Sequence, residues 1–241
     1  MGFEALILGV GIAAGAVAAV AGFGIGSLLT PVLIPSVGGK LAVALVALPH
    51  AIATAIRLVR LRAAIDWRIL RTFGLASALG SLAGALLFAR SGNALLSAVL
   101  GILLIGVGAL QLAGLARRLT ITGPWSIVAG VVSGAFGGLV GNQGGLRSAA
   151  LLGFGLSSRA FVATAAAIAL LVDLVRAPIY VAIAGEQLLS YWPTLIAATI
   201  GVTIGTFVGT VVLLRLSERA FQRIIGALLI ALGIWLLGQT R

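Results

Sequence analysis

The sequence predicts an all-α polytopic membrane protein made of two inverted repeats, and three observations lead to this fold class. Hydrophobic residues make up 61% of the 241 residues and charged residues only 9%, with a mean hydropathy of +1.24. This composition excludes an ordinary soluble domain. Two apolar segments are overlong and broken by glycines, and the second half of the chain repeats features of the first. Each repeat is predicted to hold one glycine-broken re-entrant hairpin and three transmembrane helices.

Eight apolar segments follow one another along the chain. Six are close to the roughly 20 residues that a helix needs to cross a bilayer, whereas the first and the fifth are about half as long again. The segments are 5–37, 41–59, 69–88, 94–113, 125–155, 161–184, 191–214 and 221–237.

Glycine clusters interrupt the two overlong segments. The denser cluster lies in residues 134–147 and includes Asn142, Gln143 and Arg147, and a weaker copy occupies residues 22–27. Glycine weakens a helix by roughly 1 kcal/mol relative to alanine and permits close backbone approach. Inside a bilayer, an unwound backbone must be buried in protein or line a wet cavity. The two breaks therefore predict one shared internal site.

The two halves of the chain match when the sequence is shifted along itself. A shift of 119 residues places Gly22 on Gly141 and Arg57 on Arg176, and a shift of 125 then places Gly80 on Gly205. The extra residues of the second copy are predicted to form a loop over 182–192. The domain prediction is a first repeat over 1–115 and a second over 124–241, within one membrane domain.

The net charge of +11 comes mostly from loops between apolar segments, so it indicates topology rather than nucleic-acid binding. With re-entrant hairpins, one face holds ten basic residues and the other three. The positive-inside rule then places both termini on the non-cytoplasmic side. The cytoplasmic set is Arg60, Arg62, Arg68, Arg71, Arg117, Arg118, Arg159, Arg215, Arg219 and Arg223, and the other is Lys40, Arg90 and Arg241.

A second topology stays open at this point. If each of the eight segments crosses once, the same residues divide seven to six and show almost no bias. The first arm, residues 3–21, is nearly long enough to cross alone.

The glycine breaks and the duplication resemble those of the sulfite exporter TauE/SafE family over essentially the whole chain. The resemblance is carried by residues 22–31, 42–57 and 137–145, by Ile65-Asp66-Trp67, and by 163–176. It implies a multi-pass protein of the bacterial inner membrane that exports or imports sulfite and organosulfur anions. The first glycine run is interrupted by Ile25 and Ser27, where the family shows consecutive glycines.

The hairpin tips are the predicted substrate-binding site. A broken helix exposes N–H groups where its second half begins, and the helix dipole favours an anion there. Close helix packing is the alternative role of such glycines. Arg147 offers a forked guanidinium to an oxyanion, or else snorkels or binds a helix end. The predicted binding residues are Gly24, Gly26, Ser27, Asn142, Gln143, Gly144, Gly145 and Arg147.

Four further residues are candidates for coupling or gating. Asp173 is the acid well inside an apolar segment, and it either carries a proton or pairs locally with Arg176 three residues on. His50 titrates in a range suited to a proton relay, or is an ordinary hydrogen-bonded residue. Thr54 aligns with Asp173 under the shift of 119. Arg57 is assigned to the basic loop that follows.

The predicted function is a secondary transporter of a small anion, with alternating access. An anion channel and a structural subunit of a membrane complex remain alternatives. No enzyme motif or metal site is recognised, and no cofactor is predicted. Proton or sodium coupling and a homodimer are left open.

Overall fold

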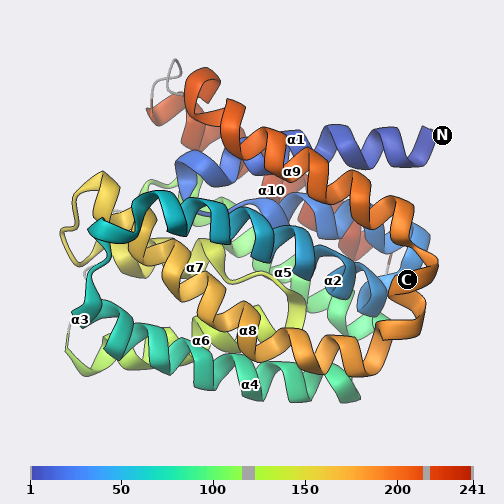
Figure 1. The fold of residues 1–241 in the computed structure, drawn as a ribbon, viewed down its shortest axis with the longest axis horizontal. Helices are drawn as coiled ribbons and strands as arrows, with labels where there is room; N and C mark the ends of the chain where they lie inside the picture. Colours follow the sequence, from blue (N-terminus) through green and yellow to red (C-terminus); the bar gives the residue numbers. More distant parts are fainter. Residues whose placement is uncertain (1, 116–122, 214–217, 240–241) are drawn as a thin grey trace.

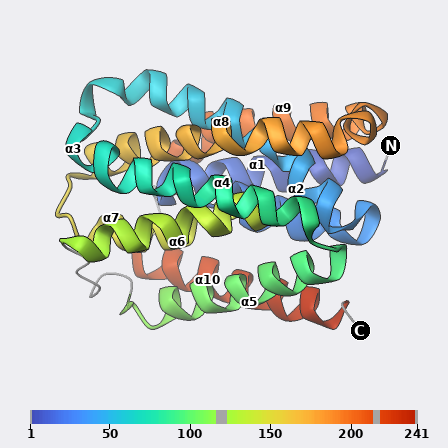
Figure 2. The same cartoon turned by 90° about the horizontal axis from the view of Figure 1, so that it is seen from below.

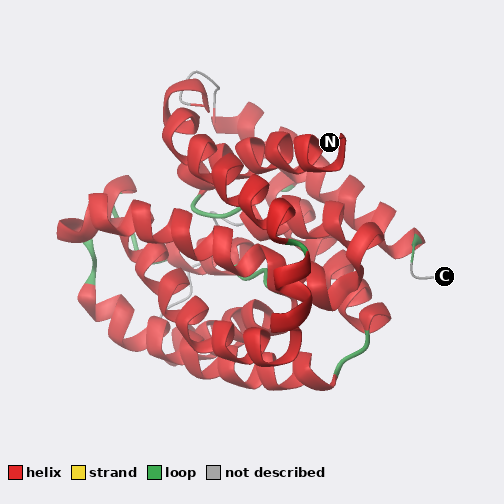
Figure 3. Cartoon of the chain, turned by 45° about the vertical axis from the view of Figure 1, so that its right-hand side comes forward, coloured by secondary structure: helices red, strands yellow, loops and turns green. Residues whose placement is uncertain are grey.

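The computed structural model describes residues 2–115, 123–213 and 218–239, and every regular element in these ranges is helical. Figure 3 shows long helices joined by short loops. The topology residues Arg117, Arg118, Arg215 and Arg241 lie outside the described residues. The helices are α1 (Gly2–Ala21), α2 (Ile25–Leu61), η1 (Arg62–Ala64), α3 (Trp67–Ile69), η2 (Leu70–Gly74), α4 (Leu75–Arg90), α5 (Asn93–Leu112), α6 (Pro124–Val140), α7 (Gly144–Leu152), α8 (Ser158–Ser190), α9 (Trp192–Leu213) and α10 (Glu218–Gly238).

Six helical stretches in the described part of the chain are long and apolar enough to cross a membrane, and two more apolar helices are shorter. The prediction of an all-helical polytopic membrane protein is therefore confirmed. The six are Gly2–Ala21, Ile25–Ala64, Trp67–Arg90, Asn93–Leu112, Ser158–Ser190 and Trp192–Gly209, and the shorter ones are Pro124–Val140 and Gln222–Gly238.

The first overlong segment folds back on itself at the first glycine cluster. Helix α1 ends at Ala21, Gly22 takes a left-handed backbone with φ 75°, and α2 returns beside α1 (Figure 1). At Gly38, with φ 79°, α2 turns again and runs back through the centre of the molecule. The predicted segments 5–37 and 41–59 are thus joined through one kinked residue, without an intervening loop.

The second overlong segment reverses in the same way. Helix α6 ends at Gly141 with φ 70°, and α7 follows after Gln143. The two reversals have the same kind of helix cap. Gly22 N–H donates to Ala18 O and Gly141 N–H donates to Gly137 O, each at 3.1 Å. A left-handed glycine after the last turn is a common helix terminator.

Helix α8 is longer than the sequence predicts. The expected loop over 182–192 is wrong, since α8 continues to Ser190 and only Tyr191 separates it from α9. The extra residues of the second half therefore lengthen a helix. At 1.5 Å per residue, 33 residues extend about 50 Å.

Glycine contacts hold three helix pairs together (Figure 2). In each pair, backbone atoms of one helix occupy the space that a Cβ would fill on the other. Helices α1 and α9 run parallel, α4 and α6 run parallel, and α5 packs against α10. The shifts of 119 and 125 convert contacts of the first pair into those of the second. Gly15 against Val202 corresponds to Gly134 against Ser77, and Gly205 against Ile12 corresponds to Gly80 against Val131.

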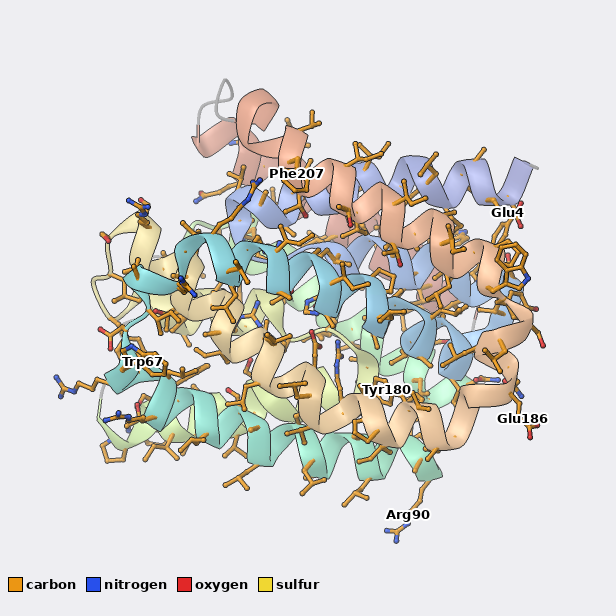
Figure 4. All side chains as sticks on the ribbon, in the orientation of Figure 1. Glu4, Trp67, Arg90, Tyr180, Glu186 and Phe207 are labelled. Carbon is orange, nitrogen blue, oxygen red and sulfur yellow. The ribbon has the colours of Figure 1, made fainter. Side chains whose placement is uncertain are left out.

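The two ends of the long axis differ in the helices that begin there. Figure 4 places Trp67 at one end and Glu4 and Glu186 at the other. Helices α1 and α9 start at the end that carries the two glutamates, whereas α4 and α6 start at the Trp67 end (Figures 1 and 2). Helices α2 and α8 pack against each other between these pairs.

Candidate functional site

The two glycine breaks meet inside the molecule. Ser27 Oγ donates to Asn142 Oδ1 at 3.1 Å, across 115 residues of sequence. A Cβ on Gly26 would lie 2.6 Å from the carbonyl oxygen of Gly141, and a Cβ on Gly144 would overlap Phe23. These glycines permit the contact because any side chain would force the two breaks apart. Ser27 and Asn142 are both buried.

Each break exposes the amino end of a helix. The first intrahelical bond of α2 runs from Leu28 N–H to Gly24 O, and that of α7 runs from Arg147 N–H to Gln143 O. The amides of residues 25–27 and 144–146 therefore have no acceptor within their own helix. Helix dipoles make both positions favourable for negative charge.

Arg147 connects the second break to the first. Its Nη2 donates to Gly22 O at 3.0 Å, and the neighbouring Ser148 Oγ donates to Ala21 O at 3.4 Å. The side chain is 1% exposed, so it does not snorkel, and Nε and Nη1 have no hydrogen-bond partner among the described residues. Part of this guanidinium thus binds a helix end, and part remains open.

His50, Asp173 and Arg176 form a continuous polar chain between α2 and α8. His50 Nδ1 lies 2.6 Å from Asp173 Oδ2, and Arg176 reaches Asp173 Oδ1 through Nε at 2.9 Å and Nη2 at 2.7 Å. Arg176 Nη1 also donates to Gly137 O at 2.6 Å, in the last turn before the second break. The predicted local pair is present, and His50 extends it across the helix interface.

Tyr180 also binds the carboxyl end of α6. Its hydroxyl donates to Gly138 O at 2.6 Å and lies 3.3 Å from Gly137 O, and its ring packs against Phe88. Figure 4 shows Tyr180 in the interior of the bundle. Arg176 and Tyr180 together satisfy carbonyl oxygens that the end of α6 leaves open.

Arg57 is buried rather than part of the basic loop, so that assignment is wrong. Helix α2 continues to Leu61, and Arg57 is 7% exposed. Its Nη2 donates to Thr54 Oγ1 at 3.0 Å, while Nη1 is buried without a hydrogen-bond partner among the described residues. Thr54 is itself fully buried and points its hydroxyl at this arginine.

The charged groups around the breaks carry a positive balance. Arg57, Arg147 and Arg176 are all buried, and Asp173 is a buried carboxylate beside Arg176. Asp173 pairs with Arg176 and His50, so no carboxylate among the described residues forms an ion pair with Arg57 or Arg147. Uncompensated charge inside a membrane protein is expensive and marks a functional site.

A cavity of about 280 Å³ adjoins the first break. Ala21, Phe23 and Ser148 form its inner wall, beside the Gly22 carbonyl that Arg147 holds. Gln111 in the last turn of α5 and Gln222 near the start of α10 line it as well, and these two helix ends lie at the α3 end of the molecule (Figure 2). The cavity therefore leads from one end of the molecule toward the breaks.

Comparison with protein families identifies the chain. The family model described as "Sulfite exporter TauE/SafE" matches residues 7–236. The chain belongs to the TauE/SafE family. No curated protein and no solved structure matches it. The TauE/SafE family comprises membrane transporters of the sulfite and sulfonate type rather than enzymes, and this chain is accordingly a multi-pass membrane protein of a transporter family.

One TauE/SafE motif of the chain has a local structural role. In Ile65-Asp66-Trp67, the Asp66 Oδ1 accepts from Ile69 N–H at 3.0 Å and caps α3. The Asp66 amide donates to Thr164 Oγ1 at 2.9 Å, which ties this turn to α8. The motif thus fixes the start of the α4 segment.

The predicted binding residues fall into two groups. Gly26, Ser27, Asn142 and Gly144 lie where the breaks touch, and Arg147 and Gln143 lie beside them with buried polar atoms that lack a partner in the described part of the chain. Gly24 and Gly145 face away. The first packs against Val17 of α1 and the second against Val107 of α5.

Sequence reasoning missed Arg57 and Tyr180 as parts of this centre. The available signal for Arg57 was its match to Arg176 under the shift of 119. Helical spacing gave a second signal, because positions 50, 54 and 57 lie on one face of a helix. Nothing in the sequence pairs Tyr180 with the end of α6. Among the described residues, no three His, Cys, Asp or Glu side chains come together to hold a metal.

Proposed function

We propose that this TauE/SafE protein is a secondary transporter of a small oxyanion, sulfite or an organosulfonate. The anion binds where the two breaks meet, near Ser27, Asn142, Gln143 and Arg147. The observation that carries the proposal is the convergence of two helix amino ends with buried guanidinium and amide groups that have unused donors. Such donors are the groups that bind oxyanions.

The transporter is built from two inverted repeats, 1–115 and 124–241, each beginning with a re-entrant hairpin. Three observations support this architecture. Both overlong segments reverse at a left-handed glycine, matched glycine contacts recur under the same shifts, and α1 and α6 run in opposite directions (Figures 1 and 2). In inverted-repeat transporters, substrate binds near the midplane at broken helices and access alternates around it.

The long axis of the molecule lies along the membrane normal, with the Trp67 end in the cytoplasm of a bacterial cell. Basic residues flank Trp67, at Arg62, Arg68 and Arg71, whereas Glu4 and Glu186 mark the opposite end. The positive-inside rule favours this orientation and places both termini outside the cytoplasm. The cavity beside the first break then opens toward the cytoplasm, as required for an exporter to load its substrate.

Flux of radiolabelled sulfite into proteoliposomes tests the function. We expect saturable uptake, reduced at least about tenfold by Arg147→Gln, because a charge-assisted hydrogen bond contributes about 1.5–3 kcal/mol. Arg159→Gln removes an exposed arginine and is the matched control. Unchanged flux in Arg147→Gln and in Asn142→Ala contradicts the proposed site. Conductance that does not saturate, recorded in a planar bilayer, indicates a channel instead.

Single cysteines in this cysteine-free chain test the topology. Ser36, Gly92 and Gln187 are exposed near the end that carries the glutamates, and Ala63 is exposed near Trp67. Ser91 is buried and Thr122 lies outside the described residues, so neither is a suitable probe. A membrane-impermeant thiol reagent added to whole cells should label the first three and leave Ala63→Cys unlabelled. Equal labelling of all four contradicts the orientation.

A further inference from the structure

Gln143 lies in the second break, directly before α7, and its side-chain amide is buried without a hydrogen bond. The residue is 3% exposed, and both Nε2 and Oε1 lack a partner among the described residues. Although Gln143 stands at the N-cap position, its side chain does not cap α7. Since both ends of the amide are unpartnered, exchanging nitrogen and oxygen would change nothing. The break therefore contains one unused donor group and one unused acceptor.

The fold makes room for this amide and holds it in place. A Cβ on Gly137 would lie 3.1 Å from Gln143 Cδ, so the side chain packs against the last turn of α6. The backbone of Gln143 is fixed as well, because its carbonyl oxygen accepts from Arg147 N–H at 2.9 Å and from Ser133 Oγ at 3.3 Å. The carbonyl oxygen of Gly137 is already bound by Arg176 Nη1 at 2.6 Å. Packing thus positions the side chain and leaves its amide open to a ligand.

The two open ends of the amide make different demands on a ligand. A buried polar group without a hydrogen bond destabilises the protein, and this holds for a donor and for an acceptor. An anion that offers only acceptor oxygens satisfies Nε2 and the neighbouring amides of residues 144–146. It leaves Oε1 without a donor. Arg147 does not supply one, because neither its Nε nor its Nη1 is hydrogen-bonded to any described residue.

We propose that Gln143 is a specificity-determining residue that reads a hydrogen-bond donor on the transported anion. The substrate class is then an organosulfonate that carries a hydroxyl or amino group. This inference rests on the proposed transport function and narrows its substrate. Nε2 donates to a sulfonate oxygen at the start of α7, and Oε1 accepts from the O–H or N–H group of the same molecule. A bound water is the competing partner, since water also donates and accepts.

Two sulfonates that differ by one hydroxyl group test the inference. The probes are sodium 2-hydroxyethanesulfonate and sodium ethanesulfonate, which have the same charge and the same carbon chain. Thermal unfolding of the purified full chain is measured in detergent at constant ionic strength. We expect the hydroxylated anion to reach its half-maximal increase in Tm at a concentration at least about tenfold lower. The reason is that the plain anion leaves Oε1 buried and unpaired.

Variants of Gln143 assign the preference to this side chain. Gln143→Met has a similar length without the amide, and the ratio of the two concentrations should fall to about one. Gln143→Glu keeps an acceptor oxygen but adds negative charge, so it should bind both anions more weakly and retain the preference. Gln187→Met alters an exposed glutamine of α8 and should leave the ratio unchanged. The ratio is taken within each variant, so a general loss of stability cancels.

Three results overturn the inference. Equal responses of the native protein to both anions would show, without any variant, that water satisfies Gln143. A tenfold preference that survives in Gln143→Met would assign the hydroxyl to another residue. Loss of the preference in Gln143→Glu would show that the acceptor oxygen is not what reads the hydroxyl. If the native protein still transports sulfite in any of these cases, the proposed function stands. Absence of sulfite flux and of stabilisation by either sulfonate contradicts the proposed function, and this inference with it.

Discussion

Helices α2 and α8 cross at the centre of the molecule and carry the same positions with different side chains. On α2 the series is His50, Thr54 and Arg57, and on α8 the matched series is Ala169, Asp173 and Arg176. The carboxylate of α8 binds the arginine of its own helix and also the histidine of α2. Helix α2 has no carboxylate for its own arginine.

This difference teaches how the two proposed repeats divide their tasks. Four glycine contacts of each half match under the shifts, and backbone packing tolerates no side chain at matched positions such as Gly15 and Gly134. The polar side chains of α2 and α8 are not under this packing constraint, and they differ between the two helices. On α8, Arg176 has a carboxylate partner on its own helix, whereas Arg57 of α2 has no carboxylate partner among the described residues. Four predictions test this contrast, from the largest expected effect to the smallest.

The largest effect is expected from Asp173→Asn. The substitution leaves Arg176 without its counter-ion and His50 without its partner. Breaking a buried ion pair costs about 3–5 kcal/mol. We expect poor yield and a lower thermal unfolding temperature in detergent. The double variant Asp173→Asn with Arg176→Gln should recover part of that loss. A fully stable single variant would show that Arg176 does not need Asp173 as its counter-ion.

The second prediction gives Arg57 of α2 a carboxylate partner like the one that Arg176 has on α8. Thr54→Asp places a carboxylate three residues before Arg57, as Asp173 stands before Arg176. We expect unimpaired thermal stability and a fall in sulfite flux of about tenfold or more, because the new carboxylate competes with the anion. Thr54→Asn, which has the same shape without the charge, is the control and should retain most flux. Unaltered flux in Thr54→Asp would show that the unpaired charge of Arg57 has no part in transport.

Much of this arrangement followed from local sequence signals. Glycines interrupt two apolar segments, so both reversals and their contact near Ser27 and Asn142 could be predicted from the sequence. The pair Asp173 and Arg176 followed from helical spacing alone. The prediction that Arg57 lies in a loop was wrong. Arg60 and Arg62 follow it closely, as is typical of a basic loop, but the helix continues to Leu61.

Other features depend on contacts that no local pattern contains. His50 meets Asp173 across 123 residues, and the rotation of α2 against α8 decides that meeting. The expected loop over 182–192 rested on the length difference between the copies. Added residues lengthen a helix as readily as a loop when no proline interrupts them, and the next proline here is Pro193.

The third prediction tests the part of the molecule that has stayed symmetric. A Cβ at Gly15 would overlap Val202 O, and a Cβ at the matched Gly134 would overlap Ser77 O. Gly15→Ala and Gly134→Ala should each destabilise the protein by about 1–3 kcal/mol, the usual cost of overpacking. Their shifts in unfolding temperature should be similar. Gly9→Ala, where no atom lies within 4 Å, is the control. A large difference between the first two would contradict equal roles for the α1–α9 and α4–α6 pairs.

The smallest effect is expected where the two copies touch through neutral groups. Ser27→Ala removes the hydrogen bond to Asn142 and leaves both helix amino ends in place. A neutral hydrogen bond contributes about 1 kcal/mol, which corresponds to roughly a fivefold change in an equilibrium constant. We expect sulfite flux to fall by no more than about that factor. Ser77→Ala removes a buried hydroxyl that has no partner among the described residues and should be nearly neutral. A Ser27→Ala variant that lost flux as completely as Arg147→Gln would show that the hydroxyl of the first break contacts the anion. Ser27 of α2 would then contact the anion beside Arg147 of α7, so that each of the two breaks would contribute one side chain to the site.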